Sequence, residues 1–275
     1  MEHRNLVDSV RAESMNAADL RAAFLVRGLF ALGEVKLLHW EAERTIVGSA
    51  VPVDGPLALE APPEIKAPFF CARRELGVLN LGGAGRVEVD GVEHALVHRD
   101  GLYVGRGPKE VVFRSDDPAK PALFYLVSHP CHAEHPTKKV TPAEAETFRI
   151  GDQEHSSVRV LRRYIHAGGP KSGQLVMGVT DLESGSVWNT MPPHSHARRT
   201  EVYLYFDLEP GAVTFHFMGR PGETRHLVVR NLEAVLSPSW SMHFAAGSSR
   251  YAFVWSMGGE NQEFDDMQGV PLDRL

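Results

Sequence analysis

The 275-residue sequence has only two cysteines, Cys71 and Cys131, and it has no long uninterrupted apolar run. Two thiols cannot build a disulfide framework, and a membrane-spanning helix needs about 20 consecutive apolar residues. The sequence also has no extended run of basic residues, which argues against a nucleic-acid groove or an anionic membrane surface as partner. The N-terminal segment carries charges throughout, unlike a secretory signal. We therefore expect a cytoplasmic protein with reduced thiols that binds neither nucleic acid nor membranes.

The composition is that of an ordinary globular protein, with 43% hydrophobic and 23% charged residues and a net charge of −6. The chain is long enough for one large domain or for two domains of about 130 residues each. The mild acidity requires no explanation beyond solubility.

Short β-branched and aromatic runs dominate the sequence after about residue 34, and Gly, Pro, Asp and Asn separate them. Before this point, residues 15–30 have helical spacing after Asn16, a plausible N-cap, and predict one short amphipathic helix. Asp90-Gly91 lies between two alternating runs and predicts a hairpin, because both residues tolerate a positive φ. Regular short strands with turn residues between them are typical of all-β sandwiches and barrels.

The strand-rich pattern occurs twice, on either side of a segment at 134–146 with two prolines and two lysines. We interpret this segment as an interdomain linker. The sequence thus predicts two tandem β-barrels, 1–135 and 136–275, although the two halves share no repeat that can be aligned by eye.

Two histidines and an acid in the second half have the spacing of metal ligands. His194 and His196 project from the same face of a strand because side chains alternate with period two. A turn after His196 can return Glu201 to their side, and His243, which precedes the last aromatic strand, is the candidate fourth ligand. Imidazole and carboxylate are ligands that Zn²⁺, Fe²⁺, Mn²⁺ and Ni²⁺ all accept. The alternative is that His194 and His196 are solvated turn residues.

The pattern HxHxxxxE followed by PxxxxH resembles the two metal motifs of the cupin superfamily, with Pro238 five residues before His243. There is one departure, because Trp240 occupies the place of the usual glycine two residues after the proline. Longer strings are similar to the bacterial 5-keto-4-deoxyuronate isomerase family, also called the 4-deoxy-L-threo-5-hexosulose-uronate ketol-isomerase family. They are RRELGVLNLGGAG (73–85), LYVGRGPKEVVF (102–113), PTKKVTP (136–142), WNTMPPHSHARRTEVY (188–203), SPSWSMH (237–243) and GENQEFDDM (259–267).

This resemblance covers nearly the whole chain and implies a bicupin with a short N-terminal helix. It implies one zinc per subunit, held by His194, His196, Glu201 and His243, and a homohexamer. It also implies a role in pectin breakdown, converting 5-dehydro-4-deoxy-D-glucuronate to 3-deoxy-D-glycero-2,5-hexodiulosonate.

Aldose–ketose isomerisation, through a cis-enediol or a hydride shift, builds negative charge on two adjacent oxygens, which a divalent metal with open positions stabilises. Four protein ligands that stay tetrahedral would instead form a closed structural site. The proton route needs a base, for which Glu260 is a candidate, with a surface or interface carboxylate as the alternative.

The substrate carboxylate calls for an arginine, because its guanidinium can bind both oxygens. The candidates are Arg163, Arg198, Arg199 and Arg225; of these, Arg199 is also counted with Glu260 as a candidate catalytic residue. Tyr203 follows Glu201 on the same strand face and could line the pocket or pack in the core.

The first half contains no HxH motif, and we expect it to be a metal-free barrel that serves assembly. His129, His132 and His135 with Cys131 could suggest a second metal, but their spacing fits neither a usual zinc motif nor one strand face. Two functions compete with the isomerase: a bicupin oxygenase that uses Fe²⁺ in the same ligand set, and a non-catalytic sugar-binding bicupin.

Overall fold

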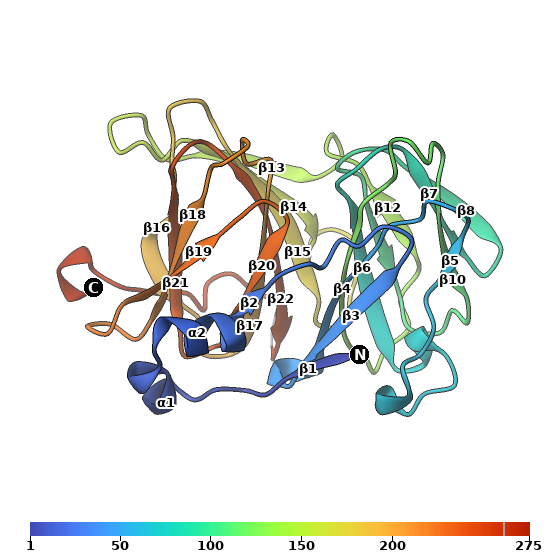
Figure 1. Ribbon diagram of the computed structural model, residues 1–275, viewed down its shortest axis with the longest axis horizontal. Helices are drawn as coiled ribbons and strands as arrows, with labels where there is room; N and C mark the ends of the chain where they lie inside the picture. Colours follow the sequence, from blue (N-terminus) through green and yellow to red (C-terminus); the bar gives the residue numbers. More distant parts are fainter. Residues whose placement is uncertain (261) are drawn as a thin grey trace. The chain divides into compact units, whose positions relative to one another are not determined.

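The computed structural model describes residues 1–260 and 262–275 (Figure 1), and these form two compact units. The first unit contains Met1–Arg4, Leu29–Ala145 and Tyr164–Val176; the second contains Asn5–Gly28, Glu146–Arg163 and Met177–Leu275. The division is therefore discontinuous, whereas the sequence had predicted a single boundary between residues 135 and 136. The segment interpreted as a linker contributes structure instead: Lys138–Val140 forms strand β12 and Glu146–Ile150 forms strand β13.

The first unit is built from two sheets, one of seven strands in the order β1-β3-β4-β11-β6-β9-β12 and one of four in the order β5-β10-β7-β8. Its strands are β1 (Glu2–Arg4), β3 (Val35–Trp40), β4 (Thr45–Ala50), β5 (Leu57–Ala58), β6 (Arg74–Asn80), β7 (Gly85–Val89), β8 (Val92–Leu96), β9 (Gly101–Val104), β10 (Val111–Ser115), β11 (Phe124–Pro130) and β12. Three short 3₁₀ helices lie between them: η1 (Ala42–Arg44), η2 (Pro63–Ile65) and η3 (Phe70–Ala72).

Apolar side chains from both sheets make the core of the first unit, among them Leu76, Val87, Phe113 and Phe124, all fully buried. The predicted hairpin is confirmed: β7 and β8 pair antiparallel, and Asp90 and Gly91 between them have φ of 46° and 80°. These left-handed angles match the right-handed twist of the strands, which is why an Asp-Gly pair is suited to this turn.

The second unit also has two sheets, one of seven strands in the order β13-β14-β15-β22-β17-β20-β2 and one of five in the order β19-β18-β21-β16-β23. Its strands are β2 (Leu25–Val26), β13, β14 (Arg159–Ile165), β15 (Val176–Leu182), β16 (Trp188–Ser195), β17 (Arg199–Phe206), β18 (Thr214–Gly219), β19 (Arg225–Val229), β20 (Glu233–Ser237), β21 (Met242–Gly247), β22 (Ala252–Gly259) and β23 (Gln268–Gly269), followed by η4 (Leu272–Arg274). The two units are thus all-β, as predicted.

Two short helices precede the strands of the second unit, α1 (Ser9–Ser14) and α2 (Ala17–Phe24). Asn16 caps α2 as predicted, because its side-chain oxygen accepts hydrogen bonds from the backbone N–H groups of Ala18 and Asp19. The helix ends at Phe24, earlier than predicted, because Leu25 and Val26 pair with β20 as a strand. In the described part of the chain, no helix has the length and apolarity needed to cross a membrane.

Trp240, the residue that departs from the cupin pattern, has a structural use in the second unit. Its indole N–H donates a hydrogen bond to the Val7 carbonyl at 2.9 Å, and its ring meets the edge of Phe24. Trp240 therefore fastens the N-terminal helical segment to the unit that contains the histidine motif.

Candidate metal centre

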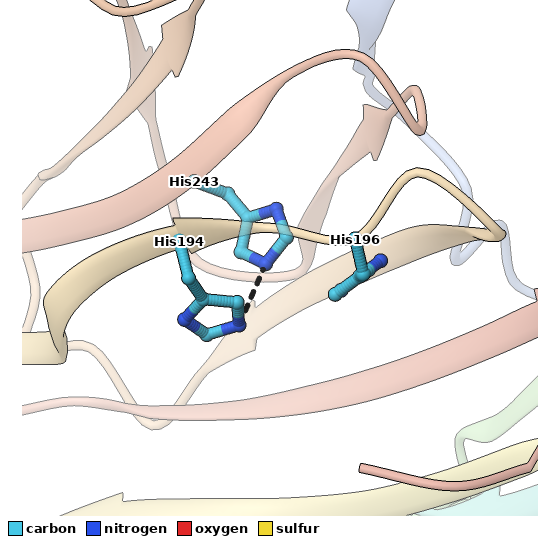
Figure 2. Close-up of side chains that lie close together, drawn as sticks. All are labelled: His194, His196 and His243. Carbon is cyan, nitrogen blue, oxygen red and sulfur yellow. Dashed lines mark hydrogen bonds between the residues drawn. The ribbon is translucent and has the colours of Figure 1, made fainter. Parts of the chain in front are cut away.

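Two adjacent antiparallel strands bring the first pair of histidines together. His194 on β16 lies opposite His243 on β21 in the strand register. Their Nε2 atoms are 3.3 Å apart (Figure 2), although 49 residues separate them in the sequence. The pairing of β16 shifts register between Asn189 and His194, so the strand is irregular just before its metal-binding motif.

The turn after β16 and the start of β17 supply the other two side chains. His196 follows the last residue of β16, and Glu201 lies on β17, between β20 and β22. One carboxylate oxygen of Glu201, Oε2, is 3.1 Å from Nε2 of His196 and 3.1 Å from Nε2 of His243. The structure therefore brings together all four residues that the sequence singled out as ligands.

The donor set fits one divalent cation. The ligand nitrogens of the three histidines lie within 4.8 Å of one another (Figure 2), and no other such group occurs in residues 1–260 and 262–275. Three imidazole nitrogens and a carboxylate oxygen suit Zn²⁺ and several other first-row divalent ions. His129, His132, His135 and Cys131 do not form a second group among these described residues.

Hydrogen bonds on the far side of two rings orient them toward the centre. Nδ1 of His196 lies 3.0 Å from the Arg199 carbonyl oxygen, and because a carbonyl only accepts, Nδ1 carries the proton and Nε2 keeps its lone pair. Nδ1 of His243 lies 3.2 Å from the Ser237 hydroxyl, which can either donate or accept, so this contact orients the ring without fixing its tautomer. The carbonyl contact of His196 thus fixes the tautomer that a metal ligand needs.

The electrostatics of the cluster favour an ionised Glu201 carboxylate beside a neutral His194 imidazole. Burial lowers the pKa of His194 to about 3. Burial acts to raise the pKa of Glu201, but His243 and His196 outweigh it and hold this pKa well below its usual range. Burial also acts to lower the pKa of His196, but the adjacent Glu201 carboxylate outweighs it and raises this pKa. Glu201 thus attracts positive charge to the point where the rings converge.

A cavity of about 420 Å³ opens on this cluster within the second unit. Of the four predicted ligands, His194, His196 and Glu201 line it, whereas His243 does not. The remaining lining is largely apolar, as is common for small-molecule sites. The larger lining side chains are Arg159, Arg199, Tyr203, Phe253, Trp255 and Phe264.

Arg199 lines the cavity, but its guanidinium is already engaged. Its Nε and Nη2 contact the two carboxylate oxygens of Asp266 at 3.1 and 2.5 Å, and Nη1 contacts the Met257 sulfur. The side chain is fully buried. Arg199 therefore ties Asp266 to β17, an arrangement that does not support the catalytic role predicted for it.

The other predicted residues lie in different places. Arg198 and Glu260 form an exposed ion pair at 3.0 Å, and neither lines the cavity. Arg225 donates a hydrogen bond to the carbonyl of Glu13 in α1. Arg163 pairs with Glu146 and, although it lies over the ring of Phe264, it does not line the cavity either. Tyr203 does line it, next to Glu201 on β17.

Arg159 is the cavity arginine that the sequence analysis missed. It is buried on β14, and its guanidinium donates to the carbonyls of Ser157 and Met191 at 2.9 and 3.3 Å. Alternation along the strand places it on the same face as Leu161, which also lines the cavity. The sequence has several arginines in this stretch, and only the strand register distinguishes Arg159 from the others.

Two tandem all-β units, the second with a histidine-rich cluster facing a cavity, define a bicupin. The chain belongs to the KduI/IolB family, whose model matches residues 33–269. Its fold is shared by an IolB-like protein from Salmonella typhimurium LT2, with a TM-score of 0.74 and 13% identity over 90% of this chain and 96% of that one. It is also shared by oxalate decarboxylase from Lactobacillus farciminis, with a TM-score of 0.57 and 9% identity over 82% and 79% of the chains.

Sequence relatives of this chain are 4-deoxy-L-threo-5-hexosulose-uronate ketol-isomerases. The one from Lachnoclostridium phytofermentans is 46% identical over 275 residues, the one from Kineococcus radiotolerans 48% over 278 and the one from Salmonella typhimurium 44% over 277, and each match covers both chains completely. The family resemblance predicted from the sequence is confirmed. The chain is an enzyme of the ketol-isomerase class, an intramolecular oxidoreductase.

Proposed function

We propose that this enzyme converts 5-dehydro-4-deoxy-D-glucuronate to 3-deoxy-D-glycero-2,5-hexodiulosonate, a step of pectin breakdown, with one Zn²⁺ held by His194, His196, Glu201 and His243. The observation that carries the proposal is the convergence of these four side chains at the wall of a cavity large enough for a sugar acid. The names of the relatives supply the substrate.

The bound cation would supply Lewis-acid stabilisation of the negative charge that develops on the two oxygens at C1 and C2 of the substrate. Overall, a hydrogen moves from C2 to C1 and the hydroxyl proton moves from the C2 oxygen to the C1 oxygen, so the carbonyl passes from C1 to C2 and no external oxidant or reductant is required. The chain itself has to bind the acid end, orient the carbonyl end toward the histidines and limit the access of water.

Arg159 is the residue that we assign to the substrate carboxylate. It lines the same cavity as His194 and Glu201, and the contacts of its guanidinium are to backbone carbonyls rather than to an acid. A buried guanidinium of this kind favours a carboxylate that enters the cavity. The aromatic and sulfur-containing wall of Phe253, Trp255 and Met257 would exclude water around the sugar chain.

Tyr203 serves as a hydrogen-bond donor in this proposal. Burial raises the pKa of its phenol well above the usual value, as does the neighbouring Glu201 carboxylate. The hydroxyl therefore stays protonated and can donate to a substrate oxygen. Glu260 is exposed, pairs with Arg198 and does not line the cavity, so this proposal gives it no role as a base.

The proposal is tested by His196→Ala, with Glu260→Gln as the matched control at an exposed acid. We expect His196→Ala to lose bound zinc, measured by elemental analysis, and to lose isomerase turnover while its circular dichroism spectrum is retained. Glu260→Gln should keep both. Full turnover by a metal-free His196→Ala protein would refute metal catalysis.

The same preparation distinguishes the iron oxygenase that shares this ligand set. The isomerase consumes no oxygen, whereas the oxygenase would take up O₂ with iron as the metal present at purification. We also propose the homohexamer and the cytoplasmic location implied by the family. Light scattering in solution would contradict the hexamer if it gave the mass of a single chain.

A further inference from the structure

The first unit has a second cavity, which the isomerase function does not use. It measures about 380 Å³ and is lined by Arg44, Arg73 and Arg106 together with Pro130, Cys131 and His132. All six residues belong to the first unit. They come from η1, the residue after η3, the turn after β9, and the end of β11 with the two residues that follow it.

In the part of the chain that the structure describes, these arginines lack acidic partners. Arg86, elsewhere in the first unit, is flanked by Glu93 and Asp116. In contrast, within residues 1–260 and 262–275, Arg44, Arg73 and Arg106 have no carboxylate at ion-pair distance. These three guanidinium groups, of which those of Arg44 and Arg73 are exposed, give the cavity a positive local potential in a chain whose net charge is −6.

Glu75, a buried acid of the first unit, already has several hydrogen-bond donors. The carboxylate of Glu75 accepts hydrogen bonds from the Tyr103 hydroxyl and from the backbone N–H groups of Gly173, Gln174 and Leu175. It is fully buried and has no ion pair with the three arginines of the cavity. Glu75 thus leaves the cavity arginines available for an anion.

Arg106 is held in place before any ligand arrives. Its Nε donates to the Ala72 carbonyl at 3.1 Å and its Nη1 to the His132 carbonyl at 3.0 Å. These bonds fix the plane of the guanidinium and leave its remaining N–H groups for another acceptor. An arginine fixed in this way loses less side-chain entropy when it binds an anion.

An unusual backbone conformation also positions Arg44. Glu43 and Arg44 are both left-handed, with φ of 48° and 49°, a conformation that residues other than glycine adopt infrequently. The buried Arg74 holds this turn, because its Nη2 donates to the Arg44 carbonyl at 2.7 Å. Backbone held in sparsely populated conformations is concentrated at ligand sites.

From these observations we infer that the cavity bounded by Arg44, Arg73 and Arg106 is a binding site for a small anionic metabolite that carries a phosphate or a carboxylate group. Guanidinium groups bind either oxyanion through paired hydrogen bonds. The volume lies toward the lower end of small-molecule sites, which span roughly 300–1,000 Å³. The site lies in the unit that lacks the histidine cluster, so it is separate from the proposed isomerase centre.

Calorimetric titration of the full-length protein at low ionic strength tests this inference, with inorganic phosphate and D-glucuronate as separate probes. We expect saturable binding of at least one probe with a dissociation constant below about 1 mM. The double variant Arg44→Gln/Arg73→Gln should weaken that binding at least tenfold. Arg250→Gln is the control, because it removes one positive charge from an exposed arginine of the second unit.

Each outcome decides the question. Binding of phosphate alone, of glucuronate alone or of both, lost in the double variant but kept in the control, supports the site and identifies its anion. The inference fails if neither probe binds saturably, if the double variant binds as well as the wild type, or if the control loses as much affinity as the double variant. Melting temperatures of the variants verify that each is folded.

Discussion

Two arginines of the second unit have opposite relations to the same cavity. Arg199 is neutralised by Asp266, and its guanidinium holds a neighbouring segment in place. Arg159 is buried with backbone carbonyls as its partners, and burial lowers its pKa without removing its charge at neutral pH. At the scale of single residues, the partner of each guanidinium therefore decides which arginine is left for a substrate carboxylate.

Replacing Arg159 by glutamine should lower kcat/KM about 10- to 100-fold, because a charged hydrogen bond contributes about 1.5–3 kcal/mol. The loss should come mainly through KM if the carboxylate is held equally in the ground and transition states. Steady-state kinetics with the keto-uronate measure both constants.

Arg225→Gln is the control for this prediction, since Arg225 was an equal candidate from the sequence but bonds beside α1. It should change kcat/KM by less than about twofold, within the ±0.5 kcal/mol expected for a change away from the site. A larger loss in Arg225→Gln than in Arg159→Gln would reverse the assignment.

His129 makes the stability of the first unit depend on pH. Burial, and secondarily the charge of Arg74, lowers its pKa to about 3. In the unfolded chain the His129 side chain has its ordinary pKa of about 6.5 and takes up a proton below that pH, whereas in the folded state it does not. The folded state therefore loses stability as the pH falls from about 6.5 toward 3.

Through this linkage, His129 lowers the free energy of unfolding by about 2 kcal/mol at pH 5 relative to pH 7. His129→Gln, which cannot titrate, should therefore show a smaller loss of unfolding free energy between these two pH values than the wild type. Urea unfolding at pH 7 and pH 5 measures the difference, and equal losses in the two proteins would exclude His129 as the cause.

At the scale of elements, residues 262–270 form a strap across the cavity of the second unit. Phe264, Met267 and Gly269 of the strap line the cavity. Backbone pairing of β23 with β16 and a hydrogen bond from Val270 to the Pro193 carbonyl fasten it to the strand that bears His194. The Arg199–Asp266 pair fastens it to β17.

Asp266→Asn should loosen this strap, because it leaves the buried Arg199 charge without a carboxylate, a change that typically costs about 3–5 kcal/mol for a buried pair. We expect faster hydrogen exchange in residues 262–270 and a higher KM, with the zinc content unchanged. Asp265→Asn is the matched control, since Asp265 is exposed and makes no ion pair among the described residues. Unchanged exchange and KM in Asp266→Asn would show that the ion pair does not hold the strap.

The sequence predicted the elements whose signals are local. The Asp90-Gly91 turn and the Asn16 cap depend on backbone conformations that these residues adopt readily, and the structure has both. The alternation rule placed His194 and His196 on one strand face, and the turn expected after His196 placed Glu201 near them. These features could be found because the relevant residues lie within a few positions of each other.

The features that the sequence did not predict depend on long-range packing. Lys138–Val140 was interpreted as part of a linker because its composition is polar, but it forms strand β12 by pairing with β9. Arg159 and the strap residue Met267 line the same cavity although they are 108 positions apart, and this cavity exists only once β14, β17 and β22 are assembled. No spacing rule connects residues at such separations.

At the scale of the whole molecule, removing the metal should affect the two units differently. A ligand that binds only the folded state at 100 times its dissociation constant stabilises it by about 2.7 kcal/mol. We therefore expect chelation to abolish turnover and to reduce hydrogen-exchange protection in β16, β17 and β21, with little change in the strands of the first unit.

Exchange mass spectrometry before and after chelation measures this contrast, and added Zn²⁺ should restore both turnover and protection. The first-unit strands serve as the internal control, because the described residues there contain no comparable ligand cluster. An equal loss of protection in both units would contradict a site confined to the second.

Segments of the two units alternate along the chain, and this limits how its gene can be recombined with that of a homologue. Because Glu75 holds the backbone of residues 173–175, the stretch Tyr164–Val176 is an integral part of the first unit even though it follows β13 of the second. No single crossover point yields one intact barrel on each side. Grafting a barrel from a homologous gene would require coordinated replacement of separate stretches, so shuffling libraries built on one junction should return mostly insoluble chimeras.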